Sequence, residues 1–339
     1  MRDALHARVA ALIDACADGA RDDVTRDALL ADLAAWQADR VEPYRRLVAS
    51  RGVPPDAVAM PTDVFRHVRV AAHPPSEDVR VFRTSGTTSG ARGAHPLRDL
   101  SLYDRAARSA ARHALFTGVD RMHLVVLAPS PAEAPDSSLS YMLGRFAEWF
   151  GARVDWVFPI DDRLARALEP ATEPVALLGT SFAFVHAEDR LDRRFALPPG
   201  SRVMQTGGFK GRSREVEPAA LRAAISARYG VPQTHIVAEY SMTELSSQLY
   251  EATLLGARER RLWVPGWVRA TVVDPETLAP VPQGQTGILR VDDPANLDTV
   301  SAIQTADLAI ARGDAIELLG RAPGAAPRGC SLAVEEALG

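Results

Sequence analysis

Hydrophobic residues in the first part of the chain recur at the spacing of helices. Val9, Leu12, Ile13 and Cys16 lie one, three or four residues apart and share one face of a predicted helix. Cys16 is therefore expected to be a core residue, because a small apolar side chain on such a face packs inside. We expect helices and their connections up to about residue 75.

Short apolar runs alternate with amphipathic segments between residues 79 and 240. The apolar runs predict strands, and the segments between them predict helices. This alternation is typical of an α/β fold with a largely parallel sheet that helices cover. The predicted strands are residues 79–85, 122–129, 153–158, 174–180, 201–208 and 234–240, and the clearest helices are residues 98–116 and 138–151.

The pattern changes after about residue 255. Residues 267–291 predict two strands with a Pro/Gly-containing connection, and residues 307–321 predict a hairpin. We therefore divide the chain into a helical N-terminal segment (1–75), an α/β core (76–255), and a small β subdomain with a C-terminal segment (256–339).

Composition argues against several classes of protein. With a net charge of −4 over 339 residues, the chain has no basic excess of the kind that nucleic-acid binders carry. No stretch reaches the ~20 apolar residues of a membrane span, and the first residues do not resemble a signal peptide. The two cysteines, Cys16 and Cys330, make neither a disulfide framework nor a zinc site. We expect a cytoplasmic enzyme.

Arginine replaces lysine almost everywhere in this chain. Lys210 is the single lysine among 39 Lys and Arg residues. A coding bias explains the arginines, and the survival of one lysine favours a function, because a compact ammonium can reach a phosphate oxygen where a planar guanidinium cannot. The alternative is that Lys210 survived by accident or only packs its stem beside a pocket.

A segment rich in glycine and hydroxyl residues, TSGTTSG, spans residues 84–90 at the end of a predicted strand. The order strand, loop, helix lets backbone amides and short hydroxyl side chains surround a phosphate. The glycine patterns of the P-loop and of dinucleotide-binding folds are both absent, and a tight surface turn is the alternative. The candidate phosphate ligands are Thr84, Ser85, Gly86, Thr87, Thr88 and Ser89.

TSGTTSG resembles the phosphate loop of the acyl-adenylate-forming superfamily, T-S-G-T-T-G-x-P-K-G. Ser89 replaces the second glycine, and the Pro-Lys pair is missing. EYSMTE (239–244) is similar to the superfamily's Y-G-x-T-E stretch. The resemblance implies that Tyr240 lies against adenine, that Thr243 contacts the α-phosphate, and that Glu244 holds Mg²⁺, a hard cation that carboxylates suit. Taken alone, the stretch could equally be a strand end or a helix cap.

Three further stretches follow in the order of the superfamily. TGG resembles the glycine-rich turn beside the adenine, TADLA is similar to the T-G-D stretch, and GRAPGAAPRG resembles the hinge, although the hinge acids do not match. Five stretches in order are far more specific than any single one. The residues that they imply are Gly207 and Gly208 beside the adenine, Asp307 on the ribose hydroxyls and Arg321 in the hinge.

Within the superfamily, GGFKG, EYSMTELSSQLYE and RGCSL look closest to the acyl-protein synthetases of the LuxE type, over about residues 60–335. The resemblance implies the α/β fold of an adenylate-forming N-terminal domain, with largely parallel sheets covered by helices, a small β subdomain and no C-terminal lysine domain. It also implies ATP-dependent activation of a fatty acid and transfer of the acyl group to the chain's own Cys330. A partner acyl reductase would then receive the acyl group.

Cys330 also has a plainer interpretation, as a free cysteine that acts as a small buried hydrophobe. Unlike Cys16, it lacks an apolar helical pattern, and Arg328 nearby would favour a reactive thiolate. We assign to Lys210 the positive charge that the lysine domain supplies in other members of the superfamily. The candidate catalytic residues are Lys210, Thr243, Glu244 and Cys330.

Several alternatives stay open. The ligase could pass the acyl group directly to a carrier protein, to CoA or to an amine, or the chain could be a non-catalytic nucleotide-binding scaffold. The acid could be fatty or aryl, and ATP and Mg²⁺ are the expected cofactors. His95 could contact the phosphates or the carboxylate, or it could open the following helix as a structural residue. Phe182, Phe184 and Val185 could line an acyl pocket, although such a run is more often core.

Overall fold

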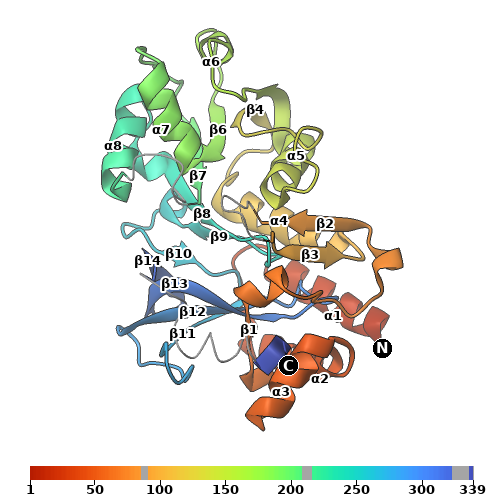
Figure 1. Cartoon of the computed structure of the whole chain (residues 1–339). Coiled ribbons are helices and arrows are strands. Elements are labelled where there is room, and N and C mark those ends of the chain that lie inside the picture. The colour runs from red at the N-terminus through yellow and green to blue at the C-terminus, as the bar shows by residue number, and fades with distance from the viewer. Residues whose placement is uncertain (85–90, 208–215, 323–335, 339) are drawn as a thin grey trace.

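Most of the chain forms one layered α/β body (Figure 1). The computed structural model describes residues 1–84, 91–207, 216–322 and 336–338. The predicted α/β class is confirmed, with helices on both faces of a large mixed sheet. Within the described residues, no helix is both long and apolar enough to cross a membrane.

The main sheet has 12 strands, in the order β11-β12-β13-β14-β10-β9-β8-β7-β6-β4-β5, with β1 paired to β13. The five strands from β5 to β8 run parallel, and those from β8 to β11 run antiparallel. The strands are β1 (Met60–Pro61), β4 (Met122–Leu127), β5 (Gly151–Trp156), β6 (Val175–Thr180), β7 (Arg202–Thr206), β8 (Ile236–Tyr240), β9 (Leu249–Glu251), β10 (Leu262–Trp263), β11 (Arg269–Val273), β12 (Thr286–Asp292), β13 (Ala302–Arg312) and β14 (Ala315–Arg321).

Helices cover the sheet and enclose two main hydrophobic cores. One core lies among the parallel strands and α6 to α8, and the larger one joins α1, α2, α4 and α5 to strands from both halves of the sheet. Caps fix several helix ends. The side chain of Ser137 caps α5, and α8 ends at Gly230, which has φ +67°. The helices are α1 (Arg2–Ala15), α2 (Asp23–Arg40), α3 (Glu42–Arg51), α4 (Ser101–Ala114), α5 (Ser138–Phe150), α6 (Arg163–Leu168), α7 (Ser181–Arg190) and α8 (Pro218–Tyr229).

The C-terminal half of the sheet follows the sequence pattern closely. The two strands expected in residues 267–291 are β11 and β12, and the hairpin expected in residues 307–321 is β13 and β14. Its turn passes through Gly313, whose φ of +64° favours glycine. The hairpin is longer than expected, because β13 begins at Ala302.

The order of elements around the glycine-rich segment differs from the expected strand, loop and helix. A short strand β3 (Ala94–Leu97) follows the segment and pairs antiparallel with β2 (Arg80–Arg83), so the segment connects a hairpin. The helix α4 begins only at Ser101. The expectation that His95 opens that helix is wrong, because His95 lies on β3 opposite Phe82. Pairing with β2 accounts for the strand, and three of its four residues are buried.

Candidate active site

Tyr240, at the end of β8, meets Asp307 on β13. The Tyr240 hydroxyl donates a hydrogen bond of 2.8 Å to Oδ2 of Asp307. Arg321 on β14 is the cross-strand partner of Asp307, so three candidate residues that are far apart in the chain lie together. Burial, with the charge of Asp307, raises the pKa of Tyr240 well above its ordinary value. The phenol therefore stays protonated and orients the carboxylate.

Hydrogen bonds between Thr84, where the glycine-rich segment begins, and Gly93, shortly after it, extend the β2–β3 hairpin. Thr84 N–H donates to the carbonyl of Gly93 (3.0 Å), and Gly93 N–H donates to the Thr84 hydroxyl (2.9 Å). Arg92 Nε donates to the carbonyl of Thr84 (2.6 Å), and its Nη1 pairs with Asp136 (2.6 Å). Thr84 therefore occupies a defined place at the base of the candidate phosphate loop.

The carboxylate of Glu244 lies beside this base. A Cβ on Gly93 would lie 3.0 Å from Cγ2 of Thr84 and 3.5 Å from Oε1 of Glu244. Only a residue without a side chain fits this gap without displacing the threonine methyl. Thr84 and Glu244, which are 160 positions apart in the sequence, are thus both in contact range of one glycine.

The turn that carries Thr243 and Glu244 is held by buried polar side chains from the segment after β12. Asp293 is fully buried, and its carboxylate accepts hydrogen bonds from the amides of Ser246 (3.0 Å) and Ser247 (2.7 Å). Asn296 Nδ2 donates to the carbonyl of Glu244 (2.8 Å). Burial raises the pKa of Asp293, although these donors favour its ionised form. Side chains of the segment after β12 therefore fix this turn by bonding its backbone groups.

His95 joins this turn to the hairpin. It is fully buried, with Nδ1 2.7 Å from the carbonyl of Thr243 and Nε2 3.1 Å from the hydroxyl of Thr299. Burial lowers the pKa of His95 to about 4, so the imidazole is neutral near pH 7. Both ring nitrogens have partners within the protein.

Gly207 follows β7 with φ +69°, and its carbonyl accepts a hydrogen bond of 2.8 Å from the hydroxyl of Ser181. Nothing lies within 4 Å of a Cβ built on Gly207, so the backbone angle, and not lack of space, favours glycine there. The hydroxyl of the preceding Thr206 donates to Oε2 of Glu239. Glu239 is buried and lies on β8, the strand between β7 and β9.

Several predicted site residues lie outside the described residues, and their roles stay predictions. They are Ser85, Gly86, Thr87, Thr88, Ser89, Gly208, Lys210 and Cys330. Cys16 is buried in the core as expected, and burial raises the pKa of its thiol. Phe184 and Val185 lie in the core beside α8, whereas Phe182 stacks on His186 at a centroid distance of 5.9 Å.

The described residues contain no group of three or more His, Cys, Asp or Glu side chains that could hold a metal ion. Mg²⁺ does not require such a group, because enzymes commonly hold it with one or two carboxylates and the phosphates of the substrate. Glu244, next to the base of the candidate phosphate loop, fits this kind of site.

Sequence reasoning missed the segment after β12. Asp293, Asn296 and Thr299 hold the Thr243–Glu244 turn and His95, yet in the sequence they belong to a polar run between two strands. Such a run is typical of an exposed loop, whereas every residue from 291 to 305 is buried here. The density of Asp, Asn and Thr was the only available signal.

Known proteins resemble this chain in sequence. The family model described as acyl-protein synthetase, LuxE, matches residues 45–339. The long-chain-fatty-acid–luciferin-component ligase of Aliivibrio fischeri is 21% identical over 345 residues, covering 91% of this chain and 87% of that protein. The ligase of the same name from Vibrio harveyi is 30% identical over 105 residues, and that match spans 29% of this chain and only 26% of the relative.

Solved structures resemble the chain in fold. A 2-hydroxyisobutyryl-CoA ligase with 2-HIB-AMP and CoA has a TM-score of 0.64 and 18% identity, covering 88% of this chain and 75% of its own. ATP-bound MatB from Rhodopseudomonas palustris has a TM-score of 0.51 and 18% identity, and the match covers 74% of this chain and 49% of MatB. The chain thus spans about half the length of MatB. With a family match over most of its length, the chain belongs to the acyl-protein synthetase family LuxE.

Proposed function

We propose that this protein activates a fatty acid with ATP as an acyl adenylate and then transfers the acyl group to a thiol, that of its own Cys330 in the first instance. One observation carries the proposal: two contacts converge at the end of β8. Tyr240 reaches Asp307, and Glu244, four residues later, lies beside the base of the glycine-rich segment. A nucleotide could span these two places, with its ribose at one and its phosphates at the other.

The roles follow from the chemistry of each group. The carboxylate of Asp307 suits the ribose hydroxyls, and Arg321 lies opposite it. Nothing lies within 4 Å of a Cβ built on Gly207, so Gly207, followed by Gly208 in the sequence, would lie beside the adenine. At the other end, the hydroxyls of Thr243 and of the Ser and Thr residues within 84–89 would donate to the phosphates, with the backbone N–H of Gly86. Mg²⁺, held by Glu244 and the phosphates, would supply charge neutralisation there. ATP-bound MatB and the 2-hydroxyisobutyryl-CoA ligase with 2-HIB-AMP, both similar in fold, support this arrangement.

The reaction has two steps. A carboxylate oxygen of the acid attacks the α-phosphorus of ATP, the bond to the β-phosphate oxygen breaks, and pyrophosphate leaves. A thiolate then attacks the carbonyl carbon of the mixed anhydride, and AMP leaves with the electrons of the broken C–O bond. Activation is needed because a free carboxylate is anionic and has a poor leaving group, and both steps need cations where negative charge builds up.

The acid is a long-chain fatty acid under this proposal, since both curated relatives carry that substrate in their names. The two names do not state which chemical group receives the acyl chain, so they support a protein acceptor less strongly than they support the fatty acid. The alternative is that a carrier protein, CoA or an amine receives the acyl group directly and that Cys330 is structural. An experiment must distinguish this alternative from acylation of Cys330. The sequence also left an aryl acid open as the substrate, so the substrate pool includes aryl acids.

The first test is the mass of the intact protein after incubation with ATP, Mg²⁺ and a pool of fatty and aryl acids. Wild type is expected to gain an acyl mass that neutral hydroxylamine removes, because the product is a thioester. Cys330→Ser should lose this labile mass. Cys16→Ala is the matched control, since Cys16 is the other cysteine of the chain and is buried in the core, and it should keep the mass.

Two results would change the proposal. If no acyl mass forms but AMP appears only when a thiol or amine acceptor is added, Cys330 is structural and the protein is a ligase that feeds its acceptor directly. If ATP is not consumed with any acid or acceptor, the catalytic proposal fails as a whole, and the result favours a non-catalytic scaffold that binds nucleotide or a partner.

Lys210 is proposed to supply positive charge to the phosphates during adenylation. Lys210→Ala should then lower ATP–pyrophosphate exchange by about 100-fold, which is the usual loss when one preorganised donor is removed from a charged transition state. Lys210→Arg is the matched variant, and we expect it to recover little, because a guanidinium cannot place its charge at the same point. Exchange near the wild-type rate in the folded alanine variant would show that Lys210 has no such role.

A further inference from the structure

His95 connects two parts of the candidate active site that are about 150 positions apart in the sequence. It lies on β3, the strand that returns from the glycine-rich segment, and its Nδ1 lies 2.7 Å from the carbonyl of Thr243. Thr243 precedes Glu244, whose carboxylate lies beside Gly93 at the base of the same hairpin. The two walls of the site are therefore joined both by the histidine and by the glycine contact.

The partners of the ring determine its tautomer. A backbone carbonyl only accepts, so Nδ1 must carry the proton and donate to Thr243. Nε2 then has a lone pair and accepts from the hydroxyl of Thr299 at 3.1 Å. The edge of the ring also meets Phe65 at a centroid distance of 5.9 Å and an angle of 78°. The imidazole is thus held on three sides in one orientation.

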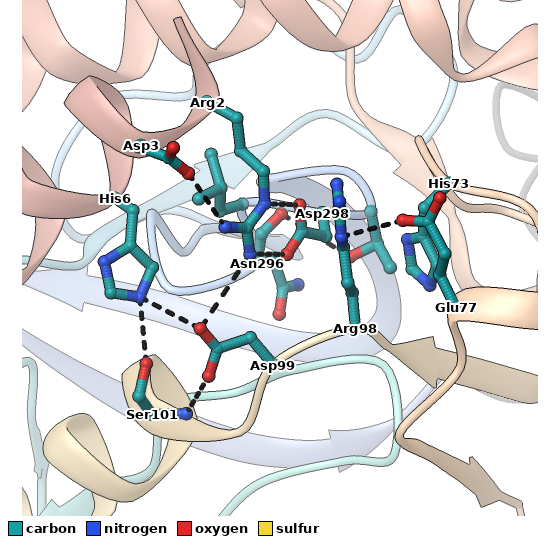
Figure 2. A network of polar contacts seen from close by, with 12 residues as sticks. Arg2, Asp3, His6, His73, Glu77, Arg98, Asp99, Ser101, Asn296 and Asp298 are labelled. Carbon is teal, nitrogen blue, oxygen red and sulfur yellow. Dashed lines mark hydrogen bonds and ion pairs between the residues drawn. The ribbon is translucent and has the colours of Figure 1, made fainter.

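The far side of this chain of contacts is firmly anchored. Arg2 at the start of α1 makes two hydrogen bonds, of 2.6 and 2.5 Å, to the carboxylate of Asp298, next to Thr299 (Figure 2). The amide of Ala72 donates to the carbonyl of Asp298 (2.8 Å), and Gln37 donates to the carbonyl of Asn296 (2.9 Å). The position of Thr299 is therefore fixed. Thr299 in turn orients the ring of His95, and the ring orients the carbonyl of Thr243.

We infer that His95 is a positioning residue for nucleotide activation: its Nδ1–H fixes the carbonyl of Thr243 and thereby aims Thr243 and Glu244 at the base of the phosphate loop. The inference rests on the proposed function, because it assigns His95 to the same site. Direct proton transfer to a substrate is not the role that the geometry supports, since the side chain is fully buried and both nitrogens are engaged within the protein.

Two substitutions separate the two nitrogens. His95→Asn places an amide N–H near the position of Nδ1 and keeps a donor for Thr243, whereas His95→Gln places its amide near Nε2 and keeps only a partner for Thr299. We expect ATP–pyrophosphate exchange of the asparagine variant to stay within about fivefold of wild type, which is the worth of one neutral hydrogen bond. The glutamine variant should lose about 100-fold, as expected when catalytic groups are displaced by about 1 Å.

Thermal unfolding of both variants separates positioning from a general loss of packing. Each variant loses one of two hydrogen bonds, so their melting temperatures should be similar while their activities differ. His123→Asn is the matched control, because His123 also lies on a strand and bonds Asp155 (2.7 Å), but its strand β4 is three strands away from β8 in the sheet. Equal activity in the two His95 variants would overturn the inference.

Nuclear magnetic resonance of wild type without nucleotide gives a second test. The ring ¹⁵N signals of His95, assigned by their loss in His95→Asn, should show a protonated Nδ1 and an unprotonated Nε2 at pH 7. The backbone amide signals of Thr243 and Glu244 should move in His95→Gln and stay nearly unchanged in His95→Asn. The opposite tautomer, or equal shifts in both variants, would overturn the inference.

The two proposals fail in different ways. If wild type shows no exchange with any acid, the proposed function is wrong, whereas the tautomer and the amide signals still decide whether His95 fixes the turn. If wild type is active and the asparagine variant falls as far as the glutamine variant, the adenylating function stands and the role of His95 is wrong.

Discussion

Glu239 is a buried carboxyl group directly before Tyr240, and only 4% of the residue is exposed. Its Oε2 accepts from the hydroxyl of Thr206, while Oε1 has no hydrogen-bond partner among the described residues. Burial raises the pKa of Glu239 to about 7, and the hydroxyls of Thr206 and Ser241 oppose this rise only in part. The group therefore takes up a proton on folding at mildly acidic pH.

This raised pKa predicts a dependence of stability on pH. Between pH 4.5 and 7 the folded state holds a proton on Glu239 that the unfolded state has lost, so the group stabilises the fold at low pH and this stabilisation is lost as the pH rises through 7. The free energy of unfolding should fall by about 3 kcal/mol from this group alone. Glu239→Gln mimics the protonated form and should lack the fall.

Urea unfolding of wild type and Glu239→Gln at pH 5 and pH 8 measures this contribution. The lowered pKa of buried His95 makes the free energy of unfolding rise with pH, and it does so in both proteins. The difference in free energy of unfolding between the two proteins at each pH cancels this effect. The variant should be close to wild type at pH 5 and more stable at pH 8. A difference that does not change with pH would mean that Glu239 is ionised in the folded protein throughout this range.

The elements that the sequence predicted well are those with a strong periodic signal. The run at residues 122–129 became β4, and the amphipathic segment 138–151 became α5, because each buries one continuous apolar face. β3 was missed, since four residues that include His95 and Pro96 carry no period and no β-branched side chain. Its strand character comes from pairing with β2, which is a tertiary contact.

In the candidate site, too, the sequence predicted some residues and missed others. Motif order predicted Tyr240, Asp307 and Arg321, and the structure brings these three together. The polar segment around Asp293 and Asn296 could not be found in this way, because its importance lies in which backbone groups it satisfies. Sequence shows that such residues are polar, whereas only the fold shows that they are buried and which turn they hold.

On the scale of the whole molecule, the N-terminal helices and the C-terminal strands share one core. The larger core contains residues from α1 and α2 together with residues from β12 and β13. Strands on both sides of residue 256 belong to one sheet, joined through β9, β10 and β14. The three-part division of the chain stays a prediction, and these contacts suggest that its parts depend on one another.

Gln37 on α2 makes this dependence testable. It lies before residue 45, where the family match begins, and it is fully buried. Its Nε2 donates to the carbonyls of Asn296 (2.9 Å) and Leu297 (3.0 Å), and its Oε1 accepts from the amide and the hydroxyl of Ser301, each at 3.0 Å. One side chain thus satisfies both ends of the segment that holds Glu244 and His95.

Gln37→Leu keeps a similar volume and removes all four hydrogen bonds. We expect the free energy of unfolding to fall by about 3 kcal/mol, since buried backbone groups lose their partners. ATP–pyrophosphate exchange should fall by about tenfold, because the loosened segment no longer fixes the catalytic turn. Leu164→Ala is the matched control: Leu164 is fully buried on α6 in the other core, and its loss should cost similar stability. If that variant loses as much exchange at the same temperature, Gln37 acts only through global stability. If it keeps its activity, helix α2 supports the candidate active site through the segment that Gln37 bonds.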